Sequence, residues 1–181
     1  MKNVEKKKGL HSAAVITCSG LLTAASVVLA VLAKYVFGEG ALRFTIECLP
    51  IFIGAFAFGP LVGGAIAVGA DLISCVIAGM APNPLITVGS FFVGLIAGVC
   101  YKLFFRKHPR IRMMLAVFGG HIIGSMVIKS LALQIYYHMG PIVLLRVPVY
   151  LGIAIIEYMI LSVLFKSKAI EHQINEVKET K

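Results

Sequence analysis

Acidic side chains are scarce in this chain: Asp and Glu number 8 among 181 residues, against 17 Lys and Arg. Three of these eight, Glu47, Asp71 and Glu157, lie within apolar sequence. Burying a carboxylate among apolar side chains is costly, so such residues usually face a cavity or a polar partner. Lys129 and Arg146 lie in equally apolar surroundings. Sparse charges of both signs in apolar sequence indicate a helical bundle that holds a polar molecule inside.

The motifs of common catalytic and nucleotide-binding classes are also missing. The sequence contains no P-loop, no His-Glu-x-x-His motif and no Gly-rich dinucleotide fingerprint. Ser125 follows His121 by four residues, but no nucleophile motif accompanies them. We therefore expect no enzyme and no resident cofactor or metal. The cysteines lack metal-type spacing and are interpreted as small packing residues: Cys18, Cys48, Cys75 and Cys100.

Apolar residues, by contrast, are abundant: they make up 59% of the chain, and the mean hydropathy is +0.94. This composition is typical of a membrane protein. The length fits one integral membrane domain over residues 1–181, without a soluble catalytic domain. We expect an all-α membrane protein with six transmembrane helices. Their approximate ranges are 13–37, 44–58, 60–78, 85–105, 113–137 and 142–165.

The basic residues predict the orientation of these spans. Lys and Arg gather in the N-terminal tail (1–12), in the 102–112 loop and in the C-terminal tail (166–181). Basic loops favour the cytoplasmic side, and an even number of spans puts all three segments there. We therefore expect cytoplasmic N and C termini. The loops expected to face outward lie near 38–43, 79–84 and 138–141.

Several buried charges fall at a similar predicted depth. Asp71 lies about seven residues before the outer end of its span, or roughly 10 Å at 1.5 Å per residue. Lys129 lies at a comparable depth, and Glu47, Arg146 and Tyr150 belong to the same outer half. The alternative is an internal salt bridge, such as Asp71 with Lys129, that only fixes packing. Buried ion pairs contribute little net stability, which favours a binding role.

Two further polar residues are interpreted as structural. Glu157 lies deeper and stands apart from the other charges. His121 is expected to pack, or to form an interhelical hydrogen bond, rather than to act as a ligand.

Small residues four apart predict close helix approach. Gly20 and Ala24 form such a pair in the first span, and Gly94 with Gly98 forms another in the fourth. Internal packing and docking of a second membrane protein both explain these pairs. Periodicity alone does not separate the two interpretations.

Three segments resemble the substrate-binding S components of energy-coupling factor (ECF) vitamin transporters. Residues 20–29 (GLLTAASVVL) are similar to the family's AxxxA segment, with Gly in the first place. Residues 42–51 (LRFTIECLPI) are similar to its entry into the second helix. Residues 58–72 (FGPLVGGAIAVGADL) resemble its FGP-x-x-G…G-x-x-D-L signature.

The resemblance is greatest to the folate group. Residues 128–133 (IKSLAL) and 145–148 (LRVP) support this choice. The chain contains no Trp, so it lacks the Asn-Thr-x-Trp-Leu-like segment expected on the fifth helix of folate members.

The resemblance implies a substrate-binding subunit that takes up a vitamin at a bacterial cytoplasmic membrane, and folate is the vitamin we expect. A transmembrane T component and two cytoplasmic ATPases would be its partners, and the S component would reorient in the membrane. Gly20 and Ala24 are then the expected docking face. The expected substrate-binding residues are Arg43, Glu47, Asp71, Asn83, Lys129, Arg146 and Tyr150.

Folate chemistry is compatible with these residues. A pterin presents an adjacent pair of N–H donors that suits one carboxylate, from Asp71 or Glu47. The carboxylates of its glutamate tail suit Arg43, Lys129 or Arg146. Similar side chains would serve riboflavin, pantothenate or a queuosine precursor. A stand-alone proton-coupled secondary transporter and an intramembrane enzyme remain alternatives, and dependence of uptake on partner ATPases separates the first of these from an S component.

Overall fold

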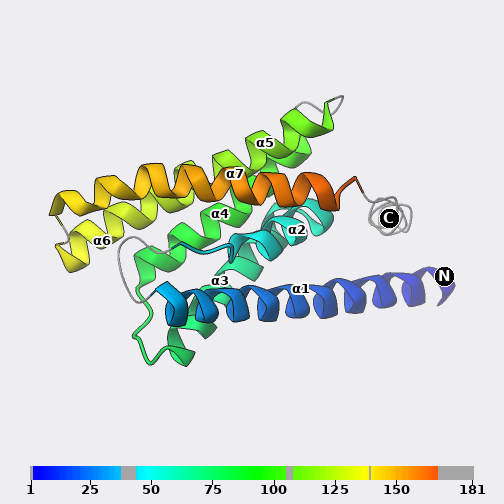
Figure 1. The fold of residues 1–181 in the computed structure, drawn as a ribbon. Coiled ribbons are helices and arrows are strands. Elements are labelled where there is room, and N and C mark those ends of the chain that lie inside the picture. The colour runs from blue at the N-terminus through cyan, green and yellow to red at the C-terminus, as the bar shows by residue number, and fades with distance from the viewer. Residues whose placement is uncertain (1, 38–43, 105–107, 139, 167–181) are drawn as a thin grey trace.

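The computed structural model describes residues 2–37, 44–104, 108–138 and 140–166, and over these ranges it contains helices and no strand (Figure 1). The α-helical class predicted from the sequence is therefore confirmed. The elements in chain order are α1 (Lys2–Phe37), α2 (Cys48–Phe58), α3 (Pro60–Ile77), α4 (Pro84–Leu103), α5 (Pro109–Gly120), the π-helix η1 (His121–Ile128), α6 (Lys129–Tyr137), the 3-10 helix η2 (Gly140–Leu145) and α7 (Arg146–Leu164).

Five segments in the described ranges are long and apolar enough to cross a membrane. One of them is the continuous helix Pro109–Tyr137, built from α5, η1 and α6. The remaining apolar helix, α2, has 11 residues. At 1.5 Å per residue it is roughly 16 Å long, about half of a bilayer's hydrocarbon core. The structure thus supports a multi-pass membrane protein, and the count of six full spans stays a prediction.

Two predicted boundaries are corrected by local geometry. The second helix begins at Cys48 rather than near Phe44, and residues 44–46 precede it without regular structure. The last helix begins at Arg146, because the 3-10 turn η2 occupies the residues that were expected to start it. The break between α2 and α3 is as predicted: Gly59 has a φ of 107°, which favours glycine, and Pro60 is suited to the first helical position.

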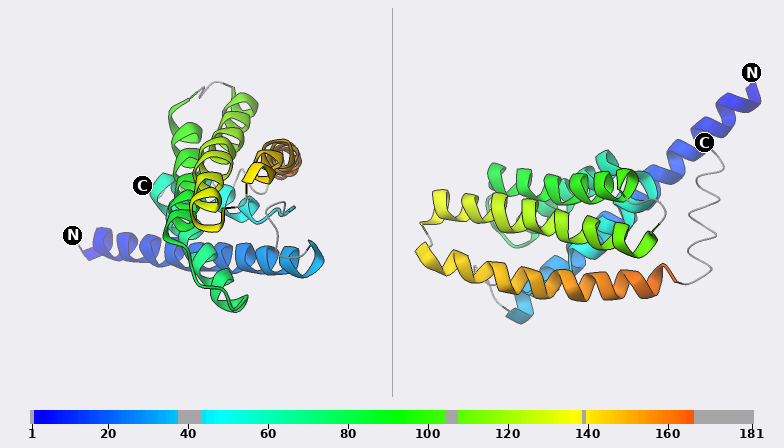
Figure 2. Two further views of the ribbon diagram at one scale, coloured as in Figure 1. Left: turned by 90° about the vertical axis from the view of Figure 1, so that its left-hand side faces the viewer. Right: turned by 90° about the horizontal axis from the view of Figure 1, so that it is seen from above.

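Helix α4 lies at the centre of the bundle and contacts α2, α3, α5, η1 and α6 (Figure 2). Helix α1 packs chiefly against α2 and α3 and lies at one side. The start of α1, the start of α5 and the end of α7 lie at one end of the bundle (Figure 1). The α3–α4 and α6–α7 connections lie at the opposite end. This arrangement agrees with the relative sidedness expected from the basic residues, while the side of the membrane stays a prediction.

Glycines set the close approach of the central helices. A Cβ on Gly94 would collide with the backbone of Gly63 and Gly64, and one on Gly98 would lie 2.5 Å from the Cα of Pro60. A Cβ on Gly124 would lie 2.8 Å from the backbone oxygen of Gly89. Internal packing is therefore the correct interpretation of these small residues.

An aromatic cluster fills the end of the bundle that carries the start of α5. The Phe56 and Tyr101 rings stack with centroids 4.1 Å apart, and Phe165 packs edge-on against Phe56. The Arg112 guanidinium lies 3.9 Å from the centroid of the Tyr101 ring, which is cation–π geometry. This cluster joins α2, α4, α5 and the end of α7.

Candidate binding cavity

A cavity opens in the half of the bundle that carries the α3–α4 connection. Its volume, counted together with its open mouth, is about 350 Å³, but the space that admits the centre of a water molecule is small. Helices α1, α2, α3, α4 and α6 all contribute to its wall. The lining side chains are Ser26, Ala30, Glu47, Cys48, Ile51, Ala67, Ala70, Asp71, Ser74, Ser90, Val93 and Lys129.

Three of the predicted charges line this cavity together: Glu47, Asp71 and Lys129. They come from the start of α2, the last two turns of α3 and the start of α6. Their convergence agrees with the depth argument from the sequence. The structure describes both Asp71 and Lys129 and records no ion pair between them within 4.0 Å. A salt bridge that only fixes packing is thus not the arrangement seen.

Asp71 is oriented by a neighbouring helix. The Thr87 hydroxyl on α4 donates a hydrogen bond of 2.7 Å to Asp71 Oδ2. The same hydroxyl also lies 3.2 Å from the Asn83 backbone oxygen. One carboxylate oxygen is therefore held in place, while the group as a whole still borders the cavity.

Lys129 reaches the cavity by crossing α4 at a glycine. A Cβ on Gly89 would lie 2.6 Å from Lys129 Cγ, so the missing side chain makes room for the lysine stem. The π-helix η1 immediately precedes Lys129 and changes the register of this span. The sequence pattern does not reveal either feature.

Glu47 is tied to the first helix through its backbone. The fully buried Ser26 hydroxyl on α1 donates a 2.6 Å hydrogen bond to the Glu47 carbonyl. The Thr45 hydroxyl lies 3.4 Å from Glu47 Oε2 and accepts from the Glu47 backbone N–H at 3.2 Å. These contacts fix the start of α2 against α1, which positions the carboxylate at the cavity wall.

The other predicted substrate residues lie elsewhere or outside the described ranges. Arg146 is buried on α7, where its Nη2 donates to the Tyr150 hydroxyl at 3.1 Å, and neither side chain lines the cavity. Asn83 caps α4, because its Oδ1 accepts from the backbone N–H groups of Leu85 at 3.0 Å and Ile86 at 3.4 Å. Arg43 lies outside the described residues. Substrate contacts by these four residues stay predictions.

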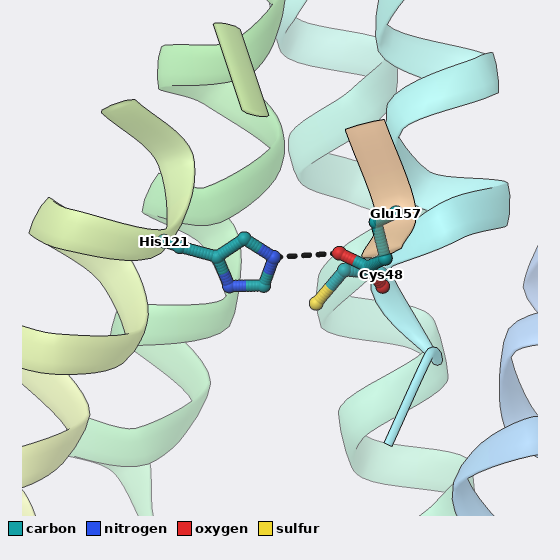
Figure 3. Close-up of side chains that lie close together, drawn as sticks. All are labelled: Cys48, His121 and Glu157. Atoms are coloured by element: carbon teal, nitrogen blue, oxygen red, sulfur yellow. Dashed lines mark hydrogen bonds and ion pairs between the residues drawn. The ribbon is translucent and has the colours of Figure 1, made fainter. Parts of the chain in front are cut away.

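Two further buried polar residues, His121 and Glu157, face one another across the core. His121 Nε2 on η1 lies 2.6 Å from Glu157 Oε2 on α7, and both side chains are fully buried (Figure 3). The expectation that His121 forms an interhelical hydrogen bond is thus confirmed. Cys48, which also lines the cavity, lies next to this pair.

The two residues predicted to form the docking face are exposed and do not pack against another helix at Gly20. Gly20 and Ala24 are both exposed on α1, and a Cβ on Gly20 would meet no atom within 4 Å. Internal packing, which explains Gly94 and Gly98, therefore does not explain Gly20.

Small hydroxyl groups of the cavity were missed at the sequence level. Ser26, Ser74 and Ser90 are buried and line it, and Thr87 orients Asp71. The sequence marks them as hydroxyl residues within apolar runs, at the same predicted depth as the charged residues. Taken together, the cavity offers two carboxylate acceptors, one ammonium donor and several hydroxyls, which suits a small polar ligand with donors and acceptors.

Comparison with known proteins identifies a family. Residues 14–169 match the family model described as "ECF transporter, substrate-specific component". No curated protein and no solved structure matches the chain.

Proposed function

Since the chain belongs to the family of ECF transporter substrate-specific components, a family of transport subunits, we propose that it binds a vitamin in the cavity of Glu47, Asp71 and Lys129 and delivers it across the membrane. Folate is the ligand whose chemistry we favour. The observation that carries the proposal is the placement of carboxylates and an ammonium group on one cavity wall without an ion pair between Asp71 and Lys129, among the described residues.

In the proposed binding mode the pterin ring donates to a carboxylate. Asp71 is the better candidate, because Thr87 already holds one of its oxygens and leaves the other for the ligand. Hydrogen bonds that involve a charged group are roughly twice as strong as neutral ones. Lys129 would bind a carboxylate of the glutamate tail as a point charge. A donor pair at one end and a negative charge at the other would then fix the ligand's orientation.

Binding a vitamin requires this cavity to widen, since the present opening admits little more than water. Phe91, Phe92, Tyr136 and Tyr150 are candidates for ring stacking, but the wall formed by the described residues contains none of them. Movement of α1 would widen the cavity, because α1 contributes Ser26 and Ala30 to its wall.

The energy for transport would come from partner subunits: a transmembrane T component and two cytoplasmic ATPases. We propose the exposed Gly20–Ala24 face of α1 as the docking site for the T component. Two small residues one turn apart let another helix approach closely in lipid, where van der Waals packing is one of the forces that drive helix association. The membrane would be the bacterial cytoplasmic membrane, with both termini on the cytoplasmic side.

Mass spectrometry of small molecules that co-purify with the detergent-solubilised protein tests the ligand. Folate or a reduced folate is expected, and riboflavin, pantothenate or a queuosine precursor would correct the vitamin while leaving the cavity assignment intact. Uptake by cells that carry the chain with and without the partner ATPases tests the mechanism. Uptake that needs only an ion gradient would contradict the proposal and favour a stand-alone secondary transporter.

A further inference from the structure

Three potential metal ligands meet in the core although the sequence spacing gives no sign of them. One ligand atom from each of Cys48, His121 and Glu157 lies within 4.8 Å of the others (Figure 3). The residues come from α2, η1 and α7, which are far apart in the sequence. Their side chains point toward one another, and their exposed fractions are 4%, 0% and 0%. The sequence did not predict this site, because the three residues are far apart in the chain and show no metal-type spacing.

We propose that Cys48, His121 and Glu157 bind one divalent transition-metal ion of the zinc type. Thiolate, imidazole and carboxylate are the three protein ligands that zinc uses. The charges also balance: a thiolate and a carboxylate neutralise a dication, and the imidazole binds as a neutral group. A neutral complex is the form that an apolar core tolerates, because an isolated buried charge is very costly.

Unpartnered polar atoms in the same place support the proposal. Glu157 Oε1 and His121 Nδ1 are buried and accept or donate no hydrogen bond within the part of the chain that the structure describes. Ser125 Oγ, four residues along from His121, is in the same situation. Leaving such a group unsatisfied costs about 1–3 kcal/mol. A metal ion that takes Glu157 Oε1 as a ligand would remove one of these costs.

The local geometry needs only a small adjustment. Zinc–ligand bonds of about 2.0–2.3 Å hold tetrahedral ligand atoms roughly 3.3–3.8 Å apart. The His121 Nε2 to Glu157 Oε2 distance of 2.6 Å is shorter than this, so the carboxylate would rotate and present its second oxygen. His121 lies at the start of a π-helix, and π-helical turns occur often at functional sites.

The cluster lies next to the cavity. Cys48 belongs both to the cavity wall and to the cluster. A protein metal site needs an entry path, and the widened cavity would supply one. With three protein ligands, a fourth coordination position would remain for a water molecule or another small ligand. The metal proposal does not depend on which vitamin the cavity binds.

Titration of the full chain, purified in detergent with a reductant and stripped of metal by a chelator, tests the proposal. Calorimetry with Zn²⁺ should show one ion per chain. Cys48→Ser and His121→Gln should each weaken zinc binding by more than about tenfold, since even residues that only support a ligand change metal affinity 10–100-fold. Cys100→Ser and His138→Gln are matched controls, because Cys100 and His138 lie outside the cluster. Both controls should keep the affinity of the original chain.

Cobalt gives a readout that needs no variant. Co²⁺ bound to the original chain should produce a near-ultraviolet thiolate-to-metal charge-transfer band and the visible bands of a tetrahedral site. Cys48→Ser should remove the charge-transfer band if that variant remains monodisperse. Absence of stoichiometric Zn²⁺ binding, zinc binding that survives both cluster substitutions, or a Co²⁺ spectrum without the thiolate band would each overturn the proposal. If the variants aggregate, the spectrum of the original chain decides alone.

Discussion

Two glycines with opposite environments make the docking face directly testable. Gly20→Leu places a large side chain on an exposed face of α1, at a position where an added Cβ would meet no atom within 4 Å. Gly94→Ala adds a single methyl group that collides with the backbone of Gly63 and Gly64 on α3. The larger substitution should therefore be the harmless one for the isolated subunit.

The expected magnitudes follow from these contacts. An exposed substitution without neighbours usually changes the free energy of unfolding by no more than about 0.5 kcal/mol. Overpacking of a tight site costs typically about 1–3 kcal/mol, and Gly94 belongs at the upper end because backbone atoms cannot rotate away. Thermal melting of the two purified variants, compared with the original chain, measures this difference.

Docking is then read from three assays on the Gly20→Leu variant. Vitamin affinity should stay unchanged, whereas co-purification with the T component and cellular uptake should both be lost. Ala24→Leu should behave in the same way, since Ala24 is exposed one turn along the same helix. Loss of vitamin binding together with assembly would show that this face serves internal packing. Retention of all three activities would remove the docking role.

Three further predictions concern individual contacts. Asn83→Ala should destabilise the protein by about 0.5–2 kcal/mol through loss of the α4 cap, whereas Asn83→Asp should keep the cap. Equal ligand affinities of the two variants, measured by titration, would argue against a substrate contact by Asn83. In metal-free protein, Glu157→Ala should cost about 1–3 kcal/mol, because it leaves a buried His121 nitrogen without its hydrogen-bond partner. Chemical denaturation of Glu157→Ala and of the His121→Phe/Glu157→Leu double variant checks this, and the double variant should be close to neutral. Arg112→Met should lower stability by about 0.5–2 kcal/mol through loss of the cation–π contact with Tyr101, and an unchanged melting temperature would contradict it.

The sequence predicted the class of fold because long apolar runs have few alternatives. Five of the expected spans appear as helices of sufficient length, and the Gly59-Pro60 break lies where it was predicted. The short helix α2 was harder to place, since the apolar character of its sequence starts before the helix does. The π-helix η1 has no periodic signature that differs clearly from an α-helix, so it was not predicted.

The cavity was predictable only where it carries charge. Asp71, Glu47 and Lys129 are conspicuous in apolar sequence, and counting residues from the span ends placed them at one depth. Depth does not determine which face of a helix a residue occupies. For that reason Arg146 was grouped with them although it bonds to Tyr150 on its own helix instead of lining the cavity.

The cluster of Cys48, His121 and Glu157 could not be predicted from the spacing of its residues in the sequence. Its three residues lie on three elements, and their meeting depends on how α2, η1 and α7 pack. A pattern of local spacing finds ligands that share a helix or a loop. It does not find ligands that are brought together only by the tertiary fold.

The central claim is that the cavity lined by Asp71 and Lys129 binds the vitamin, and a calorimetric titration with folate tests it most directly. Asp71→Asn is the sharpest change, because the amide oxygen can still accept from Thr87 while the negative charge is lost. A hydrogen bond to a charged group contributes about 1.5–3 kcal/mol, which corresponds to a loss of affinity of at least about tenfold. Lys166→Met, which removes an exposed charge just beyond α7, is the control. The account predicts stoichiometric binding by the original chain and the control and at least tenfold weaker binding by Asp71→Asn; equal affinity in all three proteins would contradict it.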